Sequence, residues 1–391
     1  MRVLLWHGYL LGGTGSNVYT RSIARGWMRA GHDVTVVCQE RHPERYDLGG
    51  ARVVVPELPD RLLPVFVLDE YEGLDARLLG DFTPEQRDAY VAANAAALRE
   101  LEPADLVFAN HVLLGAPVAA ASGLPYRVKA HGSELEYAMR GNEELSRWGA
   151  ETLAGSDVVY AGSEHIREVL DEVCGHTERV EIVPPGVDVE EFRPEPRDGA
   201  LAALVREAHD VPVSFEEFFA EDVPTVLYFG KLIENKGVQV LLEALDGLEA
   251  RAVIVGFGDY REQLEALAPA RTLFTGQLEH RHLRHLLPLC DVAAVPSIFP
   301  EAFGMVAAEA AAAGVLPVVS AHSGLAEVAA GITLETGLDL TFPTGDAAAL
   351  RERIARVLAL PAERRAELGR AARRAVEDRW SWPVVAARLL T

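Results

Sequence analysis

Lysine is scarce in this sequence. Only three of the 37 basic residues are lysines, namely Lys129, Lys231 and Lys236, and the rest are arginines. Two of the three lie in the segment GKLIENKG (230–237). A lysine ammonium is a compact point charge, unlike the planar guanidinium of arginine. Unless the pairing is chance, this segment needs a compact cation at two places.

Cysteine is rare, and long apolar runs are absent. Three cysteines without metal-ligand spacing do not build a disulfide framework, which favours a reducing cytoplasm. No apolar run reaches the roughly 18–20 residues of a membrane span. The beginning, MRVLLWHGYL, lacks the regions of a signal peptide. We therefore expect a cytoplasmic protein without a transmembrane segment.

An excess of positive charge is also missing. The formal net charge of −22 argues against nucleic acid as a partner, because binding to phosphates requires a basic face. Peripheral membrane contact through a local basic patch stays open. A length of 391 residues, 49% of them hydrophobic, fits two globular domains.

Short apolar runs alternate with helical patterns along most of the chain, and the first helical pattern covers residues 16–30. Continuous apolar strands in strand–helix–strand order are typical of parallel, doubly wound sheets. Because the runs form two series, we predict an α/β protein with two Rossmann-like domains. The first series is 2–6, 34–38, 52–55, 105–110, 157–162 and 180–183, and the second is 225–230, 251–256, 272–276, 291–296 and 315–320.

A polar, proline-bearing stretch, VPPGVDVEEFRPEPRDG (183–199), separates the two series. We predict an N-terminal domain over 1–185 and a C-terminal domain over 186–370, in which 186–224 are a linker and a helical insertion. Residues 371–391 are expected to form a helix that crosses back to the first domain. Residues 60–104 depart from the regular pattern and are expected to form polar loop and helix.

Two glycine-rich turns follow predicted strands. Gly12, Gly13 and Gly15 precede a helix, whose first N–H groups are suited to a ligand phosphate. The residue three positions after Gly15 is a valine, so the dinucleotide fingerprint G-x-G-x-x-G is incomplete. Gly256 and Gly258 supply only half of that fingerprint. Both loops are also consistent with structural turns.

The lysine segment follows a predicted strand as well. Lys231 comes directly after Gly230, and Lys236 precedes the next helix. Both cations are therefore expected at the carboxyl edge of a sheet, where open α/β sheets bind ligands. The alternative is a solvated turn.

Several histidines occupy comparable positions in the first domain. His131 follows a strand and precedes a glycine, and His7 and His111 also come at strand ends. A histidine at such a place either bonds a ligand or holds a loop. Three further histidines do not share one helical face at their spacing and are not predicted to bind a metal, namely His280, His282 and His285.

The segment SIFPEAFGMVAAEAAAAG (297–314) is apolar except for two acids, Glu301 and Glu309. In a continuous helix, eight residues rise about 12 Å. Glycosidases need carboxyl groups about 5–5.5 Å apart for retention and about 6.5–9.5 Å apart for inversion. We therefore interpret the two acids as contacts to separate parts of one extended ligand. The alternative is a surface helix with ordinary exposed acids.

Together these segments resemble the retaining glycosyltransferases of family 4, which have the GT-B fold. The family signature E-x7-E is matched by Glu301 and Glu309, within GQLEHRHLRHLLPLCDVAAVPSIFPEAFGMVAAEAAAAGVLPVVS (276–320). The resemblance implies two Rossmann-like domains that face a central cleft. Further matches are GKLIENKG, the glycines at 12–13, AHGSE (130–134), VPPGVD (183–188) and RWSWPVVAARLL (379–390).

The resemblance implies roles for the two acids. Glu301 would bind hydroxyl groups of the donor sugar, together with the main chain around Phe303, Gly304 and Met305. Glu309 would bind the ribose of the nucleotide.

The resemblance also implies roles for basic and small residues. Lys231 and Lys236 would neutralise the diphosphate, although the family often has arginine at the first of these places. His131 would lie close to the transferred sugar. With Glu301, these three residues form the predicted catalytic set, in electrostatic and positioning roles. The remaining donor-binding positions are Gly12, Gly13 and Gly230, with Phe257, Gly258 and Gln277 expected near the base.

We therefore predict a retaining hexosyltransferase that uses a nucleotide-diphosphate sugar and needs no metal or cofactor. Cations and helix N-termini would stabilise the leaving diphosphate where other enzymes use Mg²⁺. The first domain would bind the acceptor, whether saccharide, small molecule or lipid-linked. The alternatives are a non-hydrolysing sugar-nucleotide 2-epimerase of the same architecture, a nicotinamide-dependent dehydrogenase, and a sugar-nucleotide-binding protein without turnover. Neither the donor base and sugar nor the acceptor follows from the sequence.

Overall fold

The computed structural model divides into two compact units. Unit 1 comprises Met1–Gly186 and Val385–Thr391, and unit 2 comprises Val187–Val384. Each unit is built on a parallel sheet, which confirms the predicted α/β class with two Rossmann-like domains. The structure describes residues 1–13, 15–68, 71 and 73–391.

Unit 1 contains a seven-stranded sheet within the described residues. The strands are β1 (Arg2–Trp6), β2 (Asp33–Val37), β3 (Arg52–Val54), β6 (Leu106–Asn110), β7 (Tyr126–Lys129), β8 (Val158–Ala161) and β9 (Val180–Ile182). Their order is β3-β2-β1-β6-β7-β8-β9, and all neighbours are parallel. The strand order changes direction between β1 and β6, and open sheets bind ligands at the carboxyl ends beside such a point.

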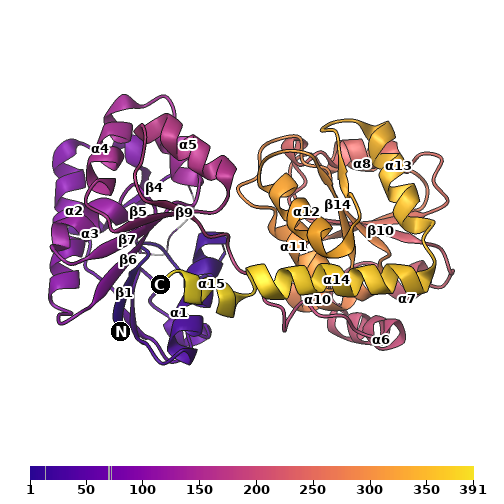
Figure 1. The fold of residues 1–391 in the computed structure, drawn as a ribbon, viewed down its shortest axis with the longest axis horizontal. Helices are drawn as coiled ribbons and strands as arrows, with labels where there is room; N and C mark the ends of the chain where they lie inside the picture. The colour runs from indigo at the N-terminus through magenta and orange to yellow at the C-terminus, as the bar shows by residue number, and fades with distance from the viewer. Residues whose placement is uncertain (14, 69–70, 72) are drawn as a thin grey trace. The chain divides into compact units, whose positions relative to one another are not determined.

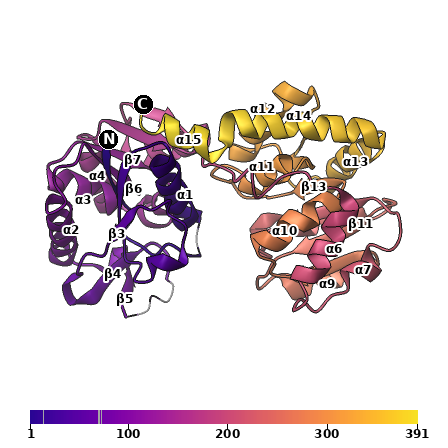
Figure 2. The same cartoon turned by 90° about the horizontal axis from the view of Figure 1, so that it is seen from below.

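Helices cover both faces of this sheet. Figures 1 and 2 show α1 on one face, and α2 and α3 on the other. The first helix buries Ile23, Ala24 and Trp27, in agreement with the predicted helical spacing. The helices of this unit are α1 (Gly15–Arg29), α2 (Pro84–Arg99), α3 (Gly115–Ser122), α4 (Glu143–Leu153) and α5 (Glu164–Cys174).

Unit 2 repeats the design with a six-stranded sheet in the described part of the chain. The strands are β10 (Thr225–Phe229), β11 (Arg251–Val255), β12 (Thr272–Gly276), β13 (Val292–Val295), β14 (Leu316–Ser320) and β15 (Thr341–Phe342). Their order is β12-β11-β10-β13-β14-β15, so the strand order changes direction between β10 and β13.

A long helix, α14 (Ala362–Trp380), packs against α11 (Met305–Ala312) and α12 (Ser323–Thr336) in unit 2, as Figure 1 shows. On the other side of the sheet, α8 (Val238–Leu245) packs against α13 (Ala347–Leu358). The remaining helices of unit 2 are α6 (Arg197–Glu207), α7 (Phe215–Phe218), α9 (Arg261–Leu267) and α10 (His280–Leu286), whereas most of α15 (Trp382–Arg388) belongs to unit 1.

Some elements differ from the sequence-based expectation. Residues 60–104 contain the expected helix, α2, but also a parallel strand pair, β4 (Leu62–Val65) and β5 (Asp75–Leu78). Residues 69, 70 and 72 of this region lie outside the described residues. The crossing segment was expected from residue 371, whereas α14 continues through that point and the part that belongs to unit 1 begins at Val385. The short strand β15 was not predicted.

Candidate functional site

The carboxyl edge of the unit 2 sheet brings two of the predicted residues together. Lys236 lies in the turn after β10, and Glu301 lies in the loop between β13 and α11. The Nζ atom of Lys236 is 2.5 Å from Oε1 of Glu301. Both side chains are partly exposed, so the pair remains open to a ligand. The opposite charges are 65 residues apart in sequence and meet because their strands are neighbours in the sheet.

Backbone contacts hold these two loops against each other. The amide of Ile298 and the hydroxyl of Ser297 both donate to the carbonyl of Asn235, at 3.0 and 3.1 Å. Gly237 has φ 68°, and a Cβ there would overlap the carbonyl oxygen of Pro296. Glycine is thus required at this crossing, both for its conformation and for the close approach.

The start of α12 fixes the Glu301 loop from the other side. The amide of Glu301 donates to Oγ of Ser323 at 2.9 Å. His322 Nε2 lies 2.7 Å from the carbonyl of Ser297 and must donate to it, and Nδ1 of the same ring lies 2.8 Å from the Ser323 hydroxyl. Ser323 has φ 47°, a conformation that L-residues rarely adopt. Sequence reasoning missed both residues, because neither belongs to a pattern that indicates chemistry.

Glu309 lies on α11 and is only 8% exposed. Burial raises the pKa of its carboxyl to about 8, and the charge of Glu191 adds to the effect. Within the described part of the chain, the carboxylate has no hydrogen-bond partner. A buried acid of this kind is costly unless a ligand satisfies it. The alternative of an ordinary exposed acid is therefore wrong for Glu309.

The spacing argument for the two acids needs a correction. Helix α11 begins only at Met305, after Gly304 with φ 106°. Glu301 therefore precedes the helix, and the rise of a continuous helix does not describe its separation from Glu309. The start of α11 beside Gly304 does agree with the expectation of a helix N-terminus there.

The other predicted donor positions lie along the same unit. Phe257 follows β11 with 54% of its surface exposed, and its carbonyl accepts from the amide of Leu232 at 2.8 Å. A Cβ on Gly258 would overlap the carbonyl of Leu232, so this glycine has a packing role. Phe303 is buried, with its ring 5.6 Å from that of Trp380. Lys231 and Gln277 are exposed, Gly230 and Met305 are half-buried, and all four lie at or near element ends.

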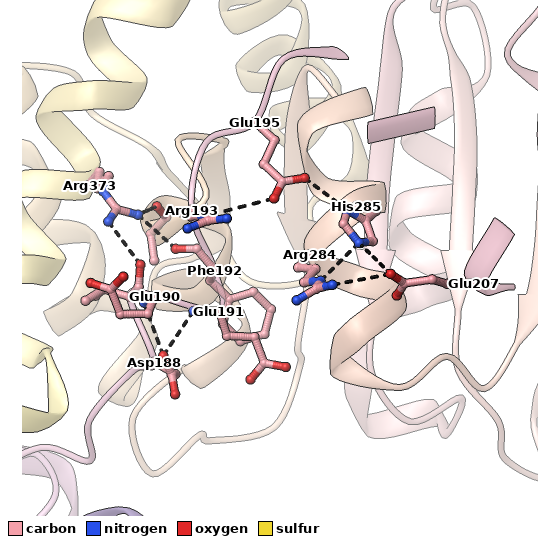
Figure 3. Close-up of polar contacts among 12 residues, drawn as sticks. Asp188, Glu190, Glu191, Phe192, Arg193, Glu195, Glu207, Arg284, His285 and Arg373 are labelled. Carbon is pink, nitrogen blue, oxygen red and sulfur yellow. Dashed lines mark hydrogen bonds and ion pairs between the residues drawn. The ribbon is translucent and has the colours of Figure 1, made fainter. Parts of the chain in front are cut away.

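The segment after Gly186 carries Glu191 toward Glu309 and is held from α14 and α10. Arg373 donates to the carbonyl of Val189 at 3.0 Å and to that of Phe192 at 2.9 Å, and Figure 3 labels Arg373 and Phe192. In the same view, His285 has carboxylates at both ring nitrogens, from Glu195 at 2.9 Å and Glu207 at 3.3 Å. His282 bonds the main chain of residue 207, and His280 lies 3.8 Å from Glu191. Thus these histidines hold the segment, and no group of three or more potential metal ligands occurs among the described residues.

In unit 1, His131 follows β7 and is half-buried. Its Nε2 lies 2.7 Å from Oδ1 of Asn110, and its amide donates to Glu134 at 2.9 Å. Burial, followed by the neighbouring His111, Lys129 and His7, lowers the pKa of His131 well below the ordinary value. His131 is therefore a neutral imidazole.

Glu134 organises the loop around His131. It is fully buried and accepts from Nδ1 of His111 at 3.1 Å and from the amide of Val112 at 3.2 Å. Burial alone would raise the pKa of this carboxyl, but the His111 side chain and the amide bonds hold it below its usual range. His111 has φ 72° and its ring is 4.7 Å from that of His131.

The glycine loop of unit 1 depends on a third histidine. His7 Nε2 lies 2.7 Å from Oδ1 of Asn17, and the amide group of Asn17 donates to the carbonyl of Gly12. Burial lowers the pKa of His7 to about 3. Gly13 is exposed with φ 89°. The structure thus gathers His7, His111 and His131, which sequence reasoning treated separately.

Comparison with known proteins identifies the family of this chain. A family model described as Glycosyltransferase Family 4 matches residues 13–191, and one described as Glycosyl transferases group 1 matches residues 212–375. A GDP-mannose-dependent alpha-(1-6)-phosphatidylinositol monomannoside mannosyltransferase of Mycolicibacterium smegmatis is 31% identical over 297 residues, which cover 71% of this chain and 72% of that protein. The chain belongs to glycosyltransferase family 4. The predicted family and enzyme class are thereby confirmed.

Two further proteins show how far the likeness of this family 4 chain extends. The D-inositol 3-phosphate glycosyltransferase of Xylanimonas cellulosilytica is 36% identical over 191 residues, but the match spans only 46% of this chain and 44% of that protein. The solved structure of Anabaena HepE in complex with UDP and glucose has a TM-score of 0.71 at 19% identity, over 99% of this chain and 98% of that one. The fold is therefore GT-B, as predicted. No helix among the described residues is long and apolar enough to cross a membrane.

Proposed function

We propose that this family 4 chain is a retaining, metal-independent glycosyltransferase that moves a hexosyl group from a nucleotide-diphosphate sugar to an acceptor hydroxyl. The observation that carries the proposal is the carboxyl edge of the unit 2 sheet. There Lys236 pairs with Glu301, and Glu301 shares one loop-and-helix segment with the buried Glu309, which has no hydrogen-bond partner among the described residues.

Each group suits one part of such a donor. The ammonium of Lys236, with Lys231 nearby in sequence, would offset the charge of the diphosphate. The second oxygen of Glu301 remains available to accept from sugar hydroxyls. Glu309 would accept from the two ribose hydroxyls, whose bonds would favour the ionised carboxylate and offset the cost of its burial. The exposed ring of Phe257 is suited to stack on the base.

Transfer with retention requires attack from the face that the leaving group occupies. The bond between the anomeric carbon and the phosphate oxygen breaks, and a bond to the acceptor oxygen forms on the same face. The acceptor proton passes to the departing phosphate oxygen. Lysine charge at the diphosphate would stabilise that leaving group without a metal ion. Unit 1, which holds His131, would bind the acceptor.

Several relatives are named as GDP-mannose-dependent mannosyltransferases, so GDP-mannose is our first candidate donor. The test is a thermal-shift and turnover screen of the purified chain against GDP-mannose, UDP-glucose and ADP-glucose, with and without EDTA. We expect one donor to raise the melting temperature and to be consumed in EDTA. Proton NMR of the product should show the anomeric configuration of the donor.

The same screen separates the competing functions. Conversion of the donor sugar to its 2-epimer without an acceptor indicates an epimerase, and a change in reduced-nicotinamide absorbance indicates a dehydrogenase. Binding without any product indicates a sugar-nucleotide-binding protein. Strict dependence on a divalent metal contradicts the proposed mechanism.

A further inference from the structure

Asn110 occupies the carboxyl end of β6 and is fully buried. Its Nδ2 donates to Oγ1 of Thr20 at 3.2 Å and to the carbonyl of Trp6 at 3.4 Å. The Thr20 hydroxyl donates its own proton to the carbonyl of Ser16 at 2.8 Å, so its oxygen acts as an acceptor toward Asn110. Because both partners act as acceptors, the Nδ2 atom of Asn110 must face Thr20 and Trp6. The Oδ1 atom of the same amide must therefore point away from them.

The oxygen of Asn110 faces His131. Oδ1 lies 2.7 Å from Nε2 of the imidazole, which is a hydrogen-bond distance. Because an amide oxygen only accepts, Nε2 must carry a proton. Glu134 fixes the backbone of the same residue by accepting from its amide at 2.9 Å. The ring therefore has one defined tautomer.

The surroundings keep this ring neutral. Burial opposes protonation most strongly, and the neighbouring basic groups His111, Lys129 and His7 lower the pKa of His131 further. The ring of Tyr19 packs edge-on at 5.0 Å. The nearest carboxylate, Glu134, directs its bonds to the amide of His131 and to the ring of His111 rather than to this imidazole. A neutral imidazole with its proton on Nε2 has a lone pair on Nδ1.

We infer that Asn110 is a positioning residue that keeps the proton of His131 on Nε2, so that Nδ1 meets the ligand as a hydrogen-bond acceptor. The matching ligand group is a hydroxyl that donates a proton, on a sugar or on an acceptor alcohol. An ionised phosphate oxygen has no proton to donate and would be repelled by the lone pair. The identity of the ligand rests on the proposed function, but the tautomer does not.

Nitrogen NMR of histidine-labelled protein tests this inference without any ligand. The His131 signals are assigned by their loss in His131→Gln. We expect one pyrrole-type nitrogen, Nε2, and one pyridine-type nitrogen, Nδ1, at neutral pH. A proton on Nδ1, or an imidazolium at neutral pH, overturns the inference. The wild-type spectrum decides this point even if variants of Asn110 do not fold.

Two variants then test whether Asn110 is the cause. Asn110→Leu removes the acceptor, so the signals should shift toward a mixture of tautomers. Asn110→Asp places a carboxylate at Nε2, which should raise the titration midpoint of His131 by about 1–3 pH units and add a matching acidic limb to the pH profile of turnover. His7 has its own amide partner, Asn17, and its signals should stay unchanged as a control. A folded Asn110→Leu protein that keeps the wild-type tautomer contradicts the role of Asn110.

A titration with GDP-mannose, or with the donor found in the screen, separates this inference from the proposed function. If a bound donor carries the matching hydroxyl, Nδ1 of His131 should shift, whereas the nucleoside diphosphate alone should leave it in place. If no nucleotide sugar binds while the tautomer is as expected, the proposed function fails and the role of Asn110 stands.

Discussion

Lys236 and Glu301 form an ion pair with 2.5 Å between Nζ and Oε1, across two loops that end neighbouring strands. The pair leaves two ammonium protons and one carboxylate oxygen for other partners. Its two halves can therefore contact adjacent parts of one ligand, an anionic group on one side and hydroxyl groups on the other. This relationship is the basis of the first prediction.

Removing the charge of Lys236 should lower turnover strongly. Lys236→Met keeps most of the side-chain bulk but leaves the leaving diphosphate less stabilised. We expect turnover to fall by about 10²- to 10³-fold, the usual effect of losing one group that stabilises developing charge. Steady-state kinetics with the donor found in the screen measures this effect. Arg370→Met, at an exposed position on α14, is the matched control. Equal turnover in both variants contradicts the assignment of the site.

Burial of Glu309 predicts a pH-dependent stability. The pKa is about 8 in the folded chain against an ordinary value of 4.5, so the folded state binds the proton more tightly. The free energy of unfolding should therefore fall as the pH rises from about 4.5 to about 8, and this contribution should be constant outside that range. Glu309→Gln should remove this slope and should also weaken nucleotide binding. Denaturant unfolding at several pH values measures the pH dependence of the free energy of unfolding, with Glu301→Gln as the control. A wild-type slope unchanged by Glu309→Gln contradicts the prediction.

Ser323 should support donor binding more than it supports stability. Its hydroxyl accepts from the amide of Glu301, but its φ of 47° is unfavourable for serine. Ser323→Gly loses the hydroxyl's bonds to the Glu301 amide and to His322, each worth about 1 kcal/mol, and relieves strain of about 1–3 kcal/mol, so the melting temperature should stay close to wild type. The Michaelis constant for the donor should rise. Thr333→Ala, on the same helix, removes a hydroxyl bond to the carbonyl of residue 338 and should leave that constant unchanged.

The crossing at Gly237 should tolerate no side chain. Gly237→Ala combines a positive φ with overlap of the Pro296 carbonyl, whereas Gly247, with φ 78°, has open space where a Cβ would lie. Gly247→Ala should cost about 1–2 kcal/mol from conformation alone, and Gly237→Ala should cost clearly more. Chemical unfolding of the two variants measures the difference. Equal losses indicate that the loops separate easily.

Most of the strand pattern could be predicted from local sequence. Runs such as RVLLW and TVLYF coincide with β1 and β10, because strands buried on both faces are mainly apolar. The pair β4 and β5 was missed, because β5 is partly exposed and its polar residues lie within a polar stretch of sequence. The two-residue strand β15 is too short to give a periodic signal.

The site was predicted as separate segments. Lys236, Glu301 and Glu309 followed from the scarcity of lysine, the acids in an apolar stretch and a family resemblance. Their arrangement did not follow from the sequence, because a break at Gly304 removes Glu301 from the helix that was assumed. His322 and Ser323 gave no signal, because hydrogen bonds to the main chain of another loop leave no sequence pattern.

The sequence by itself determined the fold class, the two series of strands and the residue types at each strand end. These depend on local periodicity and on which side chains avoid water. Only the tertiary structure decided which strand ends meet, and thereby that Lys236 pairs with Glu301 and that Asn110 orients His131. Such pairs join residues far apart in the chain, and the order of strands in each sheet, rather than any local preference, brings them within hydrogen-bond distance.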